Sequence, residues 1–344
     1  MGNDRVIKTA VVGVGHLGQH HARLYSLMEA ESPPVGAAES PPVGAAESPP
    51  GRGVELVGVS DTDEKAGRKI AEKYGTRFFP DPDELIGKVE AVSIATPTVH
   101  HYEVAKKFLE NGVHALVEKP ITADPDEALS LVNIADSKNV ILQVGHVERF
   151  NGAVIAAREY INNPRYIEVI RISPYPQRSL DIGVVMDLMI HDIDIILSFV
   201  RSKVVKIDST AAAVLSKKED IANCRIQFEN GCVATVTASR ISYKAERKIR
   251  VFEADRYISL DYGKQKFTVY RKKKEQVESI KDIEVKRPRI RKTEPLAEEL
   301  RDFITCVREG LPPQVSGRQG LDALRLALRI MDNIKNTPGA DEKK

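Results

Sequence analysis

The feature that most constrains the fold of this chain is the glycine-rich turn Gly-Val-Gly-His-Leu-Gly at residues 13–18. An apolar run at residues 7–12 leads into the turn and a segment with an apolar stripe follows it, which is the pattern of a buried strand followed by a helix. In such a turn Gly13 permits the tight bend, Gly15 lets a pyrophosphate approach the backbone, and Gly18 lets helix and strand pack closely. The turn therefore predicts a dinucleotide-binding Rossmann unit.

The same fingerprint requires an acidic residue about 20 residues further on, which binds the ribose hydroxyls. The candidate is Asp61, at the end of an apolar run at residues 54–59, but it lies too far along the chain. A tandem octapeptide, AESPPVGA, stands in between, and we interpret residues 30–52 as a flexible insertion because Pro-Pro pairs block helix and sheet hydrogen bonds. When the insertion is left out of the count, the distance along the chain from the glycine turn to Asp61 fits the fingerprint. A carboxylate here favours NAD and disfavours NADP, whose 2′-phosphate it would repel, although Arg52 and Arg68 could weaken that preference.

Strands alternate with helices up to about residue 145, at the spacing of βαβ units and a parallel sheet. Beyond this point the pattern changes to helices and runs of β character, and Glu-Asn-Gly at residues 229–231 is a hairpin signal. We expect an α/β protein of two domains. The first, at residues 1–145, is a doubly wound Rossmann domain. The second, at residues 146–336, packs helices on a mainly antiparallel sheet, and a polar tail follows at residues 337–344.

Charge and composition exclude several classes of partner. The 344 residues carry a net charge of +2, so no strong field attracts nucleic acid or a membrane surface. Basic clusters at residues 271–274 and 286–292 lack the interleaved aromatic residues of a nucleic-acid site, and we interpret them as solvated surface. No segment is long enough to span a membrane. The three cysteines form no C-x-x-C pair, which favours reduced thiols in a cytoplasmic protein.

Polar residues follow two of the expected strands at their carboxyl ends, where doubly wound sheets bind ligands. Thr96 and Pro97 close one strand, and Glu118 and Lys119 close the next. We expect Thr96, Pro97 and Glu118 beside the nicotinamide end of the cofactor. Lys119 would supply a cation near a developing alkoxide, which favours its formation.

A third candidate element is the segment DLMIHDID at residues 187–194, which we expect to be helical. Asp187 and His191 are four residues apart, so on a regular helix they share one face. A neighbouring carboxylate raises the basicity of an imidazole and fixes its tautomer, which makes His191 a candidate general base for a hydroxyl proton. The alternatives are a local ion pair on the surface and metal ligation, but no HExxH pattern or third ligand accompanies the pair.

Together these motifs resemble the Gfo/Idh/MocA oxidoreductases, the family of glucose-fructose oxidoreductase and inositol dehydrogenase. The most specific signs are VEKP at residues 117–120 and DLMIHDID at residues 187–194, and the resemblance extends nearly end to end. It implies an NAD-dependent dehydrogenase of CH–OH groups, with Lys119 as the catalytic lysine and Asp187 and His191 as the conserved acid and histidine. It also implies that the second domain has an open sheet through which the chain forms a homo-oligomer.

The segments GHVERFNGAV at residues 145–154 and DIGVVMDLMIHDIDI at residues 181–195 resemble a bacterial subgroup of this family associated with lipid A biosynthesis. That resemblance implies oxidation of the 3-hydroxyl of UDP-N-acetylglucosamine to a 3-keto sugar, with Arg149 and Asn151 as the first candidates for substrate contacts. A structural ion pair is an equal alternative for Arg149. Other interpretations are an inositol or free-sugar dehydrogenase and a non-catalytic NAD-sensing regulator. The expected site comprises the catalytic residues Lys119, Asp187 and His191, the cofactor-binding residues Gly13, Gly15, His16, Leu17, Gly18, Asp61, Thr96, Pro97, His101, Glu118 and Lys119, and the substrate-binding residues Arg149, Asn151 and His191, with no metal.

Overall fold

The structure is a computed structural model that describes residues 5–30, 53–175 and 182–336. The predicted insertion at residues 30–52 lies outside the described residues except for Ala30, and the predicted tail at residues 337–344 lies outside them entirely. The chain divides into two compact units. Unit 1 comprises Met1–Gly145 and Leu296–Leu321, and unit 2 comprises His146–Pro295 and Asp322–Lys344.

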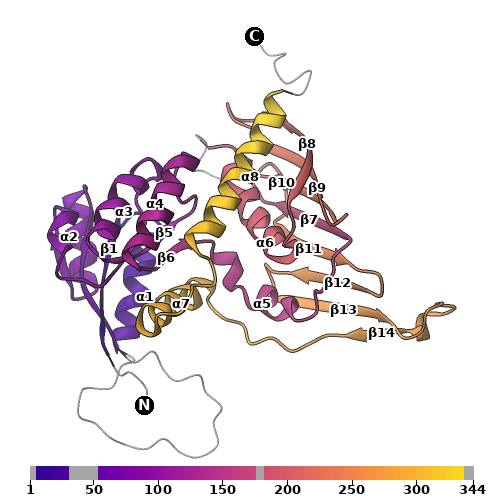
Figure 1. Cartoon of the computed structure of the whole chain (residues 1–344), viewed down its shortest axis with the longest axis horizontal. Helices are drawn as coiled ribbons and strands as arrows, with labels where there is room; N and C mark the ends of the chain where they lie inside the picture. The colour runs from indigo at the N-terminus through magenta and orange to yellow at the C-terminus, as the bar shows by residue number, and fades with distance from the viewer. Residues whose placement is uncertain (1–4, 31–52, 176–181, 337–344) are drawn as a thin grey trace, which may run out of the picture. The chain divides into compact units, whose positions relative to one another are not determined.

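Unit 1 is built on a parallel sheet of six strands in the order β3-β2-β1-β4-β5-β6 (Figure 1). This is the strand order of the doubly wound Rossmann fold, and it confirms the predicted fold class. The strands are β1 (Ile7–Val12), β2 (Val54–Ser60), β3 (Arg77–Phe79), β4 (Ala91–Ile94), β5 (His114–Glu118) and β6 (Leu142–Gly145). The connecting helices are α1 (Gly18–Ala30), α2 (Glu64–Lys73), α3 (His101–Glu110) and α4 (Pro125–Lys138), with 3-10 turns at Pro82–Leu85 and Thr98–His100.

Local sequence explains where these helices begin. The side chain of Asp63 accepts a hydrogen bond from the Ala66 N–H and starts α2. The side chain of Asp124 accepts one from the Asp126 N–H, and α4 starts with Pro125, whose missing N–H has no role in a first turn. The helices thus return the chain to successive parallel strands, whose carboxyl ends lie at the edge of the sheet that carries the glycine turn.

Helix α7 (Pro295–Glu309) belongs to the core of unit 1, and this corrects the expected domain division. Its side chains Leu300, Phe303 and Ile304 lie in one buried cluster with residues of the first strand and helix, such as Ile7 and Leu24. From the sequence alone, residues 146–336 are expected to form the second domain. An amphipathic pattern shows that a helix buries one face, but it does not show which sheet that face covers.

Unit 2 is built on an eight-stranded sheet in the order β14-β13-β12-β11-β7-β10-β9-β8 (Figure 1). Among the described strands β7 and β10 pair in parallel and every other pair is antiparallel, which confirms the predicted sheet type. Strands were expected from sequence at residues 224–228, 232–239, 248–253, 257–260 and 266–270, and β7, β8 and β14 are additional to these. The strands are β7 (Tyr166–Ile172), β8 (Val204–Ala212), β9 (Ile221–Phe228), β10 (Val233–Ser239), β11 (Glu246–Phe252), β12 (Arg256–Asp261), β13 (Lys266–Lys272) and β14 (Ile283–Lys286).

Helices cover one face of this sheet. They are α5 (Gly152–Arg158), α6 (Ile190–Val200) and the part of α8 (Gly317–Lys335) that lies in unit 2. Unit 2 also has 3-10 turns at Val147–Phe150 and Ile280–Asp282. Alternate residues of the central strand, such as Ile167 and Val169, lie in one buried cluster with Ile193 of α6 and Ala327 of α8. The intervening residues of the strand are half-buried on the opposite face.

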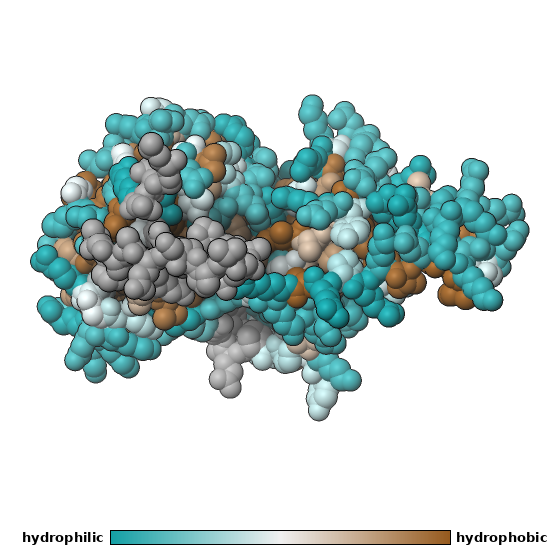
Figure 2. All heavy atoms as spheres, turned by 90° about the horizontal axis from the view of Figure 1, so that it is seen from below, coloured by the Kyte–Doolittle hydropathy of each residue, from teal (hydrophilic) through white to brown (hydrophobic). Residues whose placement is uncertain are grey.

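The surface seen in Figure 2 is mostly hydrophilic, with hydrophobic residues in small groups. In the part of the chain that is described, no helix combines the length and apolar character needed to cross a membrane. The three cysteines are free and buried, and burial raises the pKa of the Cys224 thiol to about 12 and that of Cys232 to about 11. These thiols are therefore protonated and unreactive at neutral pH.

Candidate functional site

The glycine turn between β1 and α1 has the geometry that the sequence predicts. Gly13 has a φ of 85°, and a side chain there would place Cβ 2.7 Å from the Ala95 carbonyl carbon, at the end of β4. A Cβ on Gly18 would lie 1.7 Å from the Gly13 carbonyl oxygen. At Gly15, by contrast, a Cβ would meet nothing within 4 Å among the described atoms. The fold itself thus requires the first and third glycines, whereas the second leaves open space beside the backbone, which fits a bound pyrophosphate.

Asp61, immediately after β2, is connected to this turn by its carboxylate. One oxygen accepts a hydrogen bond from the Val14 N–H at 2.7 Å and the other accepts one from the Asp63 N–H at 2.8 Å. Each carboxylate oxygen can accept a second hydrogen bond, so ribose hydroxyls remain possible partners. The nearby Arg68 forms an ion pair with Glu64 at 2.6 Å.

His101, the first residue of α3, connects the ends of two strands. Its ring nitrogens lie 2.9 Å from the carbonyl oxygens of Thr96, after β4, and Pro120, after β5. Burial lowers the pKa of His101, and the two carbonyl contacts only partly offset that effect. The side chain was expected to contact the cofactor, but its ring is 1% exposed and both nitrogens face backbone carbonyls. These contacts link the segments that carry Thr96 and Lys119, and a cofactor contact by His101 stays a prediction.

Glu118, at the end of β5, has a buried partner that the sequence analysis did not identify. Its Oε1 lies 3.1 Å from Nε2 of His21 on α1, and its Oε2 accepts a hydrogen bond from the Lys119 N–H at 3.2 Å. Burial would raise the pKa of Glu118, but the hydrogen bond and charge of His21, together with Lys119, outweigh it and hold the pKa below its usual value. The sequence does indicate that His21 is buried, because it lies on the same stripe of α1 as the apolar residues Leu24 and Met28.

In unit 2 the segment with the predicted acid and base is not a regular α-helix throughout. Val185–Met189 form a π-helix, in which the Ile190 N–H donates to the Val185 carbonyl five residues back, and α6 follows. The expectation of a regular helix over residues 187–194 is therefore wrong for its first residues, and the four-residue spacing of Asp187 and His191 no longer implies a shared face. Single π turns within helices occur frequently at functional sites. Both side chains are half-buried.

A buried ion pair holds the start of this segment. Arg240 contacts Asp220 at 2.9 Å and donates to the Ile182 carbonyl at 2.6 Å, just before the π-helix. Burial would raise the pKa of Asp220, but backbone N–H groups such as that of Leu215, together with Arg240, hold it well below its usual range. The Val184 N–H also donates to the Glu219 carbonyl at 3.1 Å. These long-range contacts were not predictable from a single sequence.

The other predicted residues of unit 2 are buried in its core. Arg149 is 3% exposed, and its Nη1 lies 3.5 Å from Oδ1 of Asp194. Asn151 caps α5 by accepting the Ala153 N–H and donates to the Tyr262 carbonyl at 2.9 Å. These contacts fit the structural alternative for Arg149, and a substrate contact by either side chain stays a prediction.

Behind α6 lies a second buried pair. Arg171 makes two contacts with Asp192, at 2.8 and 3.1 Å, and a third with Glu148 at 3.2 Å. His146 also lies beside the segment, with its ring centroid 6.2 Å from that of His191 and edge-to-face. Among the described residues, no group of three His, Cys, Asp or Glu side chains could hold a metal ion.

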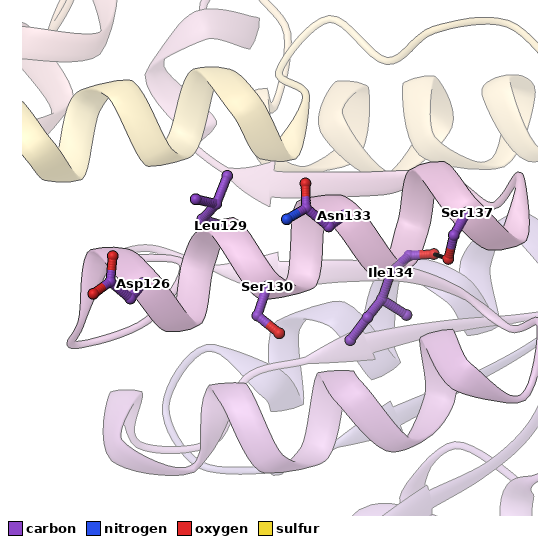
Figure 3. A pocket seen from close by; sticks show the side chains of 6 residues that line it. All are labelled: Asp126, Leu129, Ser130, Asn133, Ile134 and Ser137. Carbon is purple, nitrogen blue, oxygen red and sulfur yellow. Dashed lines mark hydrogen bonds between the residues drawn. The ribbon is translucent and has the colours of Figure 1, made fainter.

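A surface depression of about 410 Å³ lies along α4 but contains none of these residues. Figure 3 shows that its side chains all come from one helix; they are Asp126, Leu129, Ser130, Asn133, Ile134 and Ser137. A depression formed by a single helix face encloses no ligand, so we do not assign it to the site.

Comparison with known proteins places these features among oxidoreductases. A family model described as an oxidoreductase family with an NAD-binding Rossmann fold matches residues 7–146, and a Gfo/Idh/MocA C-terminal domain model matches residues 152–258. The UDP-N-acetylglucosamine 3-dehydrogenase of Acidithiobacillus ferrooxidans is 33% identical over 94% of this chain and 96% of its own length. A solved structure of that dehydrogenase from the same organism matches with a TM-score of 0.84 and 32% identity, over 96% of this chain and 98% of the other. The scyllo-inositol 2-dehydrogenase (NAD(+)) of Bacillus subtilis is 25% identical over 97% of this chain and 95% of its own.

Proposed function

This chain belongs to the Gfo/Idh/MocA family of oxidoreductases, and on that premise we propose that it is an NAD-dependent dehydrogenase that oxidises the 3-hydroxyl of UDP-N-acetylglucosamine. The observation that carries the proposal is the 33% identity to a UDP-N-acetylglucosamine 3-dehydrogenase over nearly the full length of both chains. An inositol dehydrogenase is the second candidate, because relatives with that activity match over similar lengths at 25% identity.

The glycine turn and Asp61 would hold the dinucleotide. The open space at Gly15 and the positive end of the helix dipole at the start of α1 suit a pyrophosphate, with His16 and Leu17 in the same turn. The Asp61 carboxylate would bind the adenosine ribose and repel a 2′-phosphate. Arg68, which could offset this repulsion, is paired with Glu64, and Arg52 lies outside the described residues. This supports NAD over NADP.

When bound, the nicotinamide supplies the hydride acceptor for the reaction. Oxidation of a secondary alcohol removes a hydride from carbon and a proton from oxygen, and leaves a ketone. We assign the proton to His191, with Asp187 favouring the protonated imidazole. Lys119 would polarise the reacting oxygen with its positive charge. Thr96, Pro97 and Glu118 would line the nicotinamide end of the site in unit 1.

The proposal is tested by following NADH absorbance with a panel of UDP-sugars, inositols and free sugars. We expect the highest kcat/KM with UDP-N-acetylglucosamine and NAD, and a 3-keto product. Higher kcat/KM with an inositol would replace the proposal with the second candidate. No turnover on the whole panel would leave the NAD-sensing regulator as the surviving interpretation.

A matched variant separates catalysis from cofactor binding. Lys119→Ala should abolish most hydride transfer while NAD still binds, because the glycine turn and Asp61 are intact. NAD binding is measured by calorimetry and turnover by NADH absorbance. Loss of both together would mean that Lys119 serves cofactor binding and not the chemical step.

The proposed homo-oligomer would use the face of the eight-stranded sheet opposite its helices. Four half-buried aromatic residues lie side by side there, one on each of β7, β11, β12 and β13. Successive ring centroids are 5.6 Å apart for Tyr166 and Phe252, 4.8 Å for Phe252 and Tyr257, and 5.2 Å for Tyr257 and Tyr270. Aromatic side chains are enriched at protein interfaces, which supports a second copy of the chain as the partner.

A further inference from the structure

Unit 2 contains a groove that the proposed chemistry does not use. It has a volume of about 470 Å³ and is lined by the start of β13 and by the extended segment at residues 287–292. Four cationic side chains line it, and we call them the groove cations: Lys266, Arg287, Arg289 and Lys292. All four are exposed. The right-hand end of Figure 2, where β14 lies in Figure 1, is correspondingly hydrophilic.

The groove cations differ from two cations on the same edge of the sheet, Arg271 and Lys286. Arg271 lies 3.3 Å from the carboxylate of Asp255, and Lys286 lies 3.5 Å from that of Glu284. The groove cations make no ion pair with any of the residues that the structure describes. Their positive charge is therefore available to an anionic ligand, whereas the charges of Arg271 and Lys286 are partly offset by the paired carboxylates.

The groove also has an apolar lining. The Phe267 side chain is only 4% exposed, and Pro288 and Ile290 are half-buried beside the cations. Apolar surface between cations contributes nothing to binding a bare phosphate ion. It suits a ligand in which an organic ring system is joined to a polyanion.

The wall of the groove is held in place by contacts of the lining residue Gln265 and of residues next to the lining. The amide of Gln265 donates to the Thr293 carbonyl at 2.9 Å and accepts the Thr293 N–H at 3.2 Å, so it fastens the end of the segment to β13. A Cβ on Gly152 would lie 3.1 Å from the Arg291 carbonyl oxygen, which shows how closely the segment passes α5. A preformed wall reduces the ordering that a ligand must impose on binding.

We propose that this groove binds the nucleoside diphosphate portion of a nucleotide, with the diphosphate among the groove cations and the base against the apolar lining. The volume lies within the range of small-ligand sites, about 300–1,000 Å³. A nucleic-acid strand would need a longer unpaired basic track and several exposed aromatic residues. The ligand has two possible sources: the nucleotide half of a UDP-sugar, which rests on the proposed function, or a free nucleoside diphosphate acting as an effector.

The test uses UDP and the full chain in isothermal titration calorimetry, with saturating NAD present to occupy the dinucleotide site. The groove variant R287Q/R289Q/K292Q is compared with the control R271Q/K274Q/K286Q, which removes the same charge from paired positions on the same edge. We expect the Kd for UDP to rise at least tenfold in the groove variant and less than twofold in the control. Absence of UDP binding to the wild type, or an equal change in both variants, would overturn the proposal.

Two further probes define the ligand. Inorganic pyrophosphate should bind at least tenfold more weakly than UDP, and equal affinity would refute a role for the nucleoside. A single-stranded oligonucleotide that binds more tightly than UDP, with the same dependence on the groove cations, would replace the proposal with a nucleic-acid site.

Kinetics then separates the two sources. If the substrate's own nucleotide half occupies the groove, the groove variant raises the KM for UDP-N-acetylglucosamine tenfold with kcat unchanged. If the groove serves an effector, that KM is unchanged and UDP still binds in the presence of saturating substrate. Either outcome supports the proposal. Calorimetry needs no turnover, so a failure of the proposed function would leave this test of binding intact.

Discussion

The imidazole of His21 and the carboxylate of Glu118 meet in the interior although 97 positions separate them in the chain. We predict that His21→Leu lowers the free energy of unfolding by about 1–3 kcal/mol at pH 7, because the buried carboxylate loses its partner. The pKa of Glu118 is depressed in the folded state, so its contribution is present above the unfolded pKa and is lost as pH falls through the folded pKa. The difference between variant and wild type should therefore shrink in acid.

Urea denaturation at pH 7 and pH 4 measures this effect. The control is His20→Leu, at a half-buried neighbouring position on the same helix, which should change stability by less than about 0.5 kcal/mol. Equal losses at the two positions would show that the effect belongs to the helix and not to the pair.

Asp194 gives the opposite pH dependence. Burial raises its pKa to about 7, although Arg149 opposes this shift. Between about pH 4 and pH 7 the folded state binds more protons at this carboxyl than the unfolded state, so its contribution to stability falls as pH rises through that range. We predict that Asp194→Asn, which cannot ionise, raises Tm relative to the wild type more at pH 8 than at pH 5. Thermal unfolding of wild type and variant is measured at pH 5 and pH 8, with the exposed Asp208→Asn as the control. If Asp194→Asn leaves the pH dependence of Tm unchanged, Asp194 is not the source of the effect.

At the scale of elements, α7 shows how a segment late in the sequence can stabilise the first fold unit. Phe303 on this helix is fully buried in the unit 1 cluster. We predict that Phe303→Ala costs about 3–5 kcal/mol and reduces hydrogen-exchange protection in β1 and α1. The matched control is Phe199→Ala, in the core of unit 2, which should reduce protection in that unit instead. The reverse distribution of protection would contradict the division of the chain.

The π-helix at Val185–Met189 shows that residue spacing alone does not determine which side chains share a helix face. Residue spacing on an assumed α-helix placed Asp187 and His191 on one face, but one wider turn changes the angle between them. Propensity and periodicity do not distinguish a π turn from an α turn, because both bury similar side chains. The roles of the two residues therefore stand on the resemblance to a family and not on helical spacing.

At the scale of the whole molecule, the aromatic face of the eight-stranded sheet predicts that copies of the chain associate with one another. We expect Tyr257→Lys to lower the oligomeric state in light scattering coupled to size exclusion, because it places a charge in the middle of the aromatic row. Tyr243→Lys is the control, since Tyr243 is 96% exposed and lies outside the strands. A monomeric wild type, or equal dissociation in both variants, would contradict the proposed interface.

Much of the fold followed from local patterns in this sequence. The strand, glycine turn and helix at residues 7–30, the alternation up to residue 145 and the hairpin at residues 229–231 all depend on contacts between near neighbours. Strand β7 was missed although its residues alternate between buried and half-buried positions, because charged residues interrupt its apolar pattern. Its pairing with both β10 and β11 places it in the middle of the sheet, which is a property of the assembled sheet and not of the strand.

By itself, the sequence determined the dinucleotide turn, the acid that follows it once the repeat is left out of the count, and the motifs that identify an oxidoreductase family. Each depends on residue type and short spacing, which the chain carries locally. Only the tertiary structure decided that His21 supports Glu118, that His101 joins two strand ends, and that α7 completes unit 1. These are contacts between residues far apart in the chain, and they depend on which buried faces pack together, which a periodic pattern does not specify.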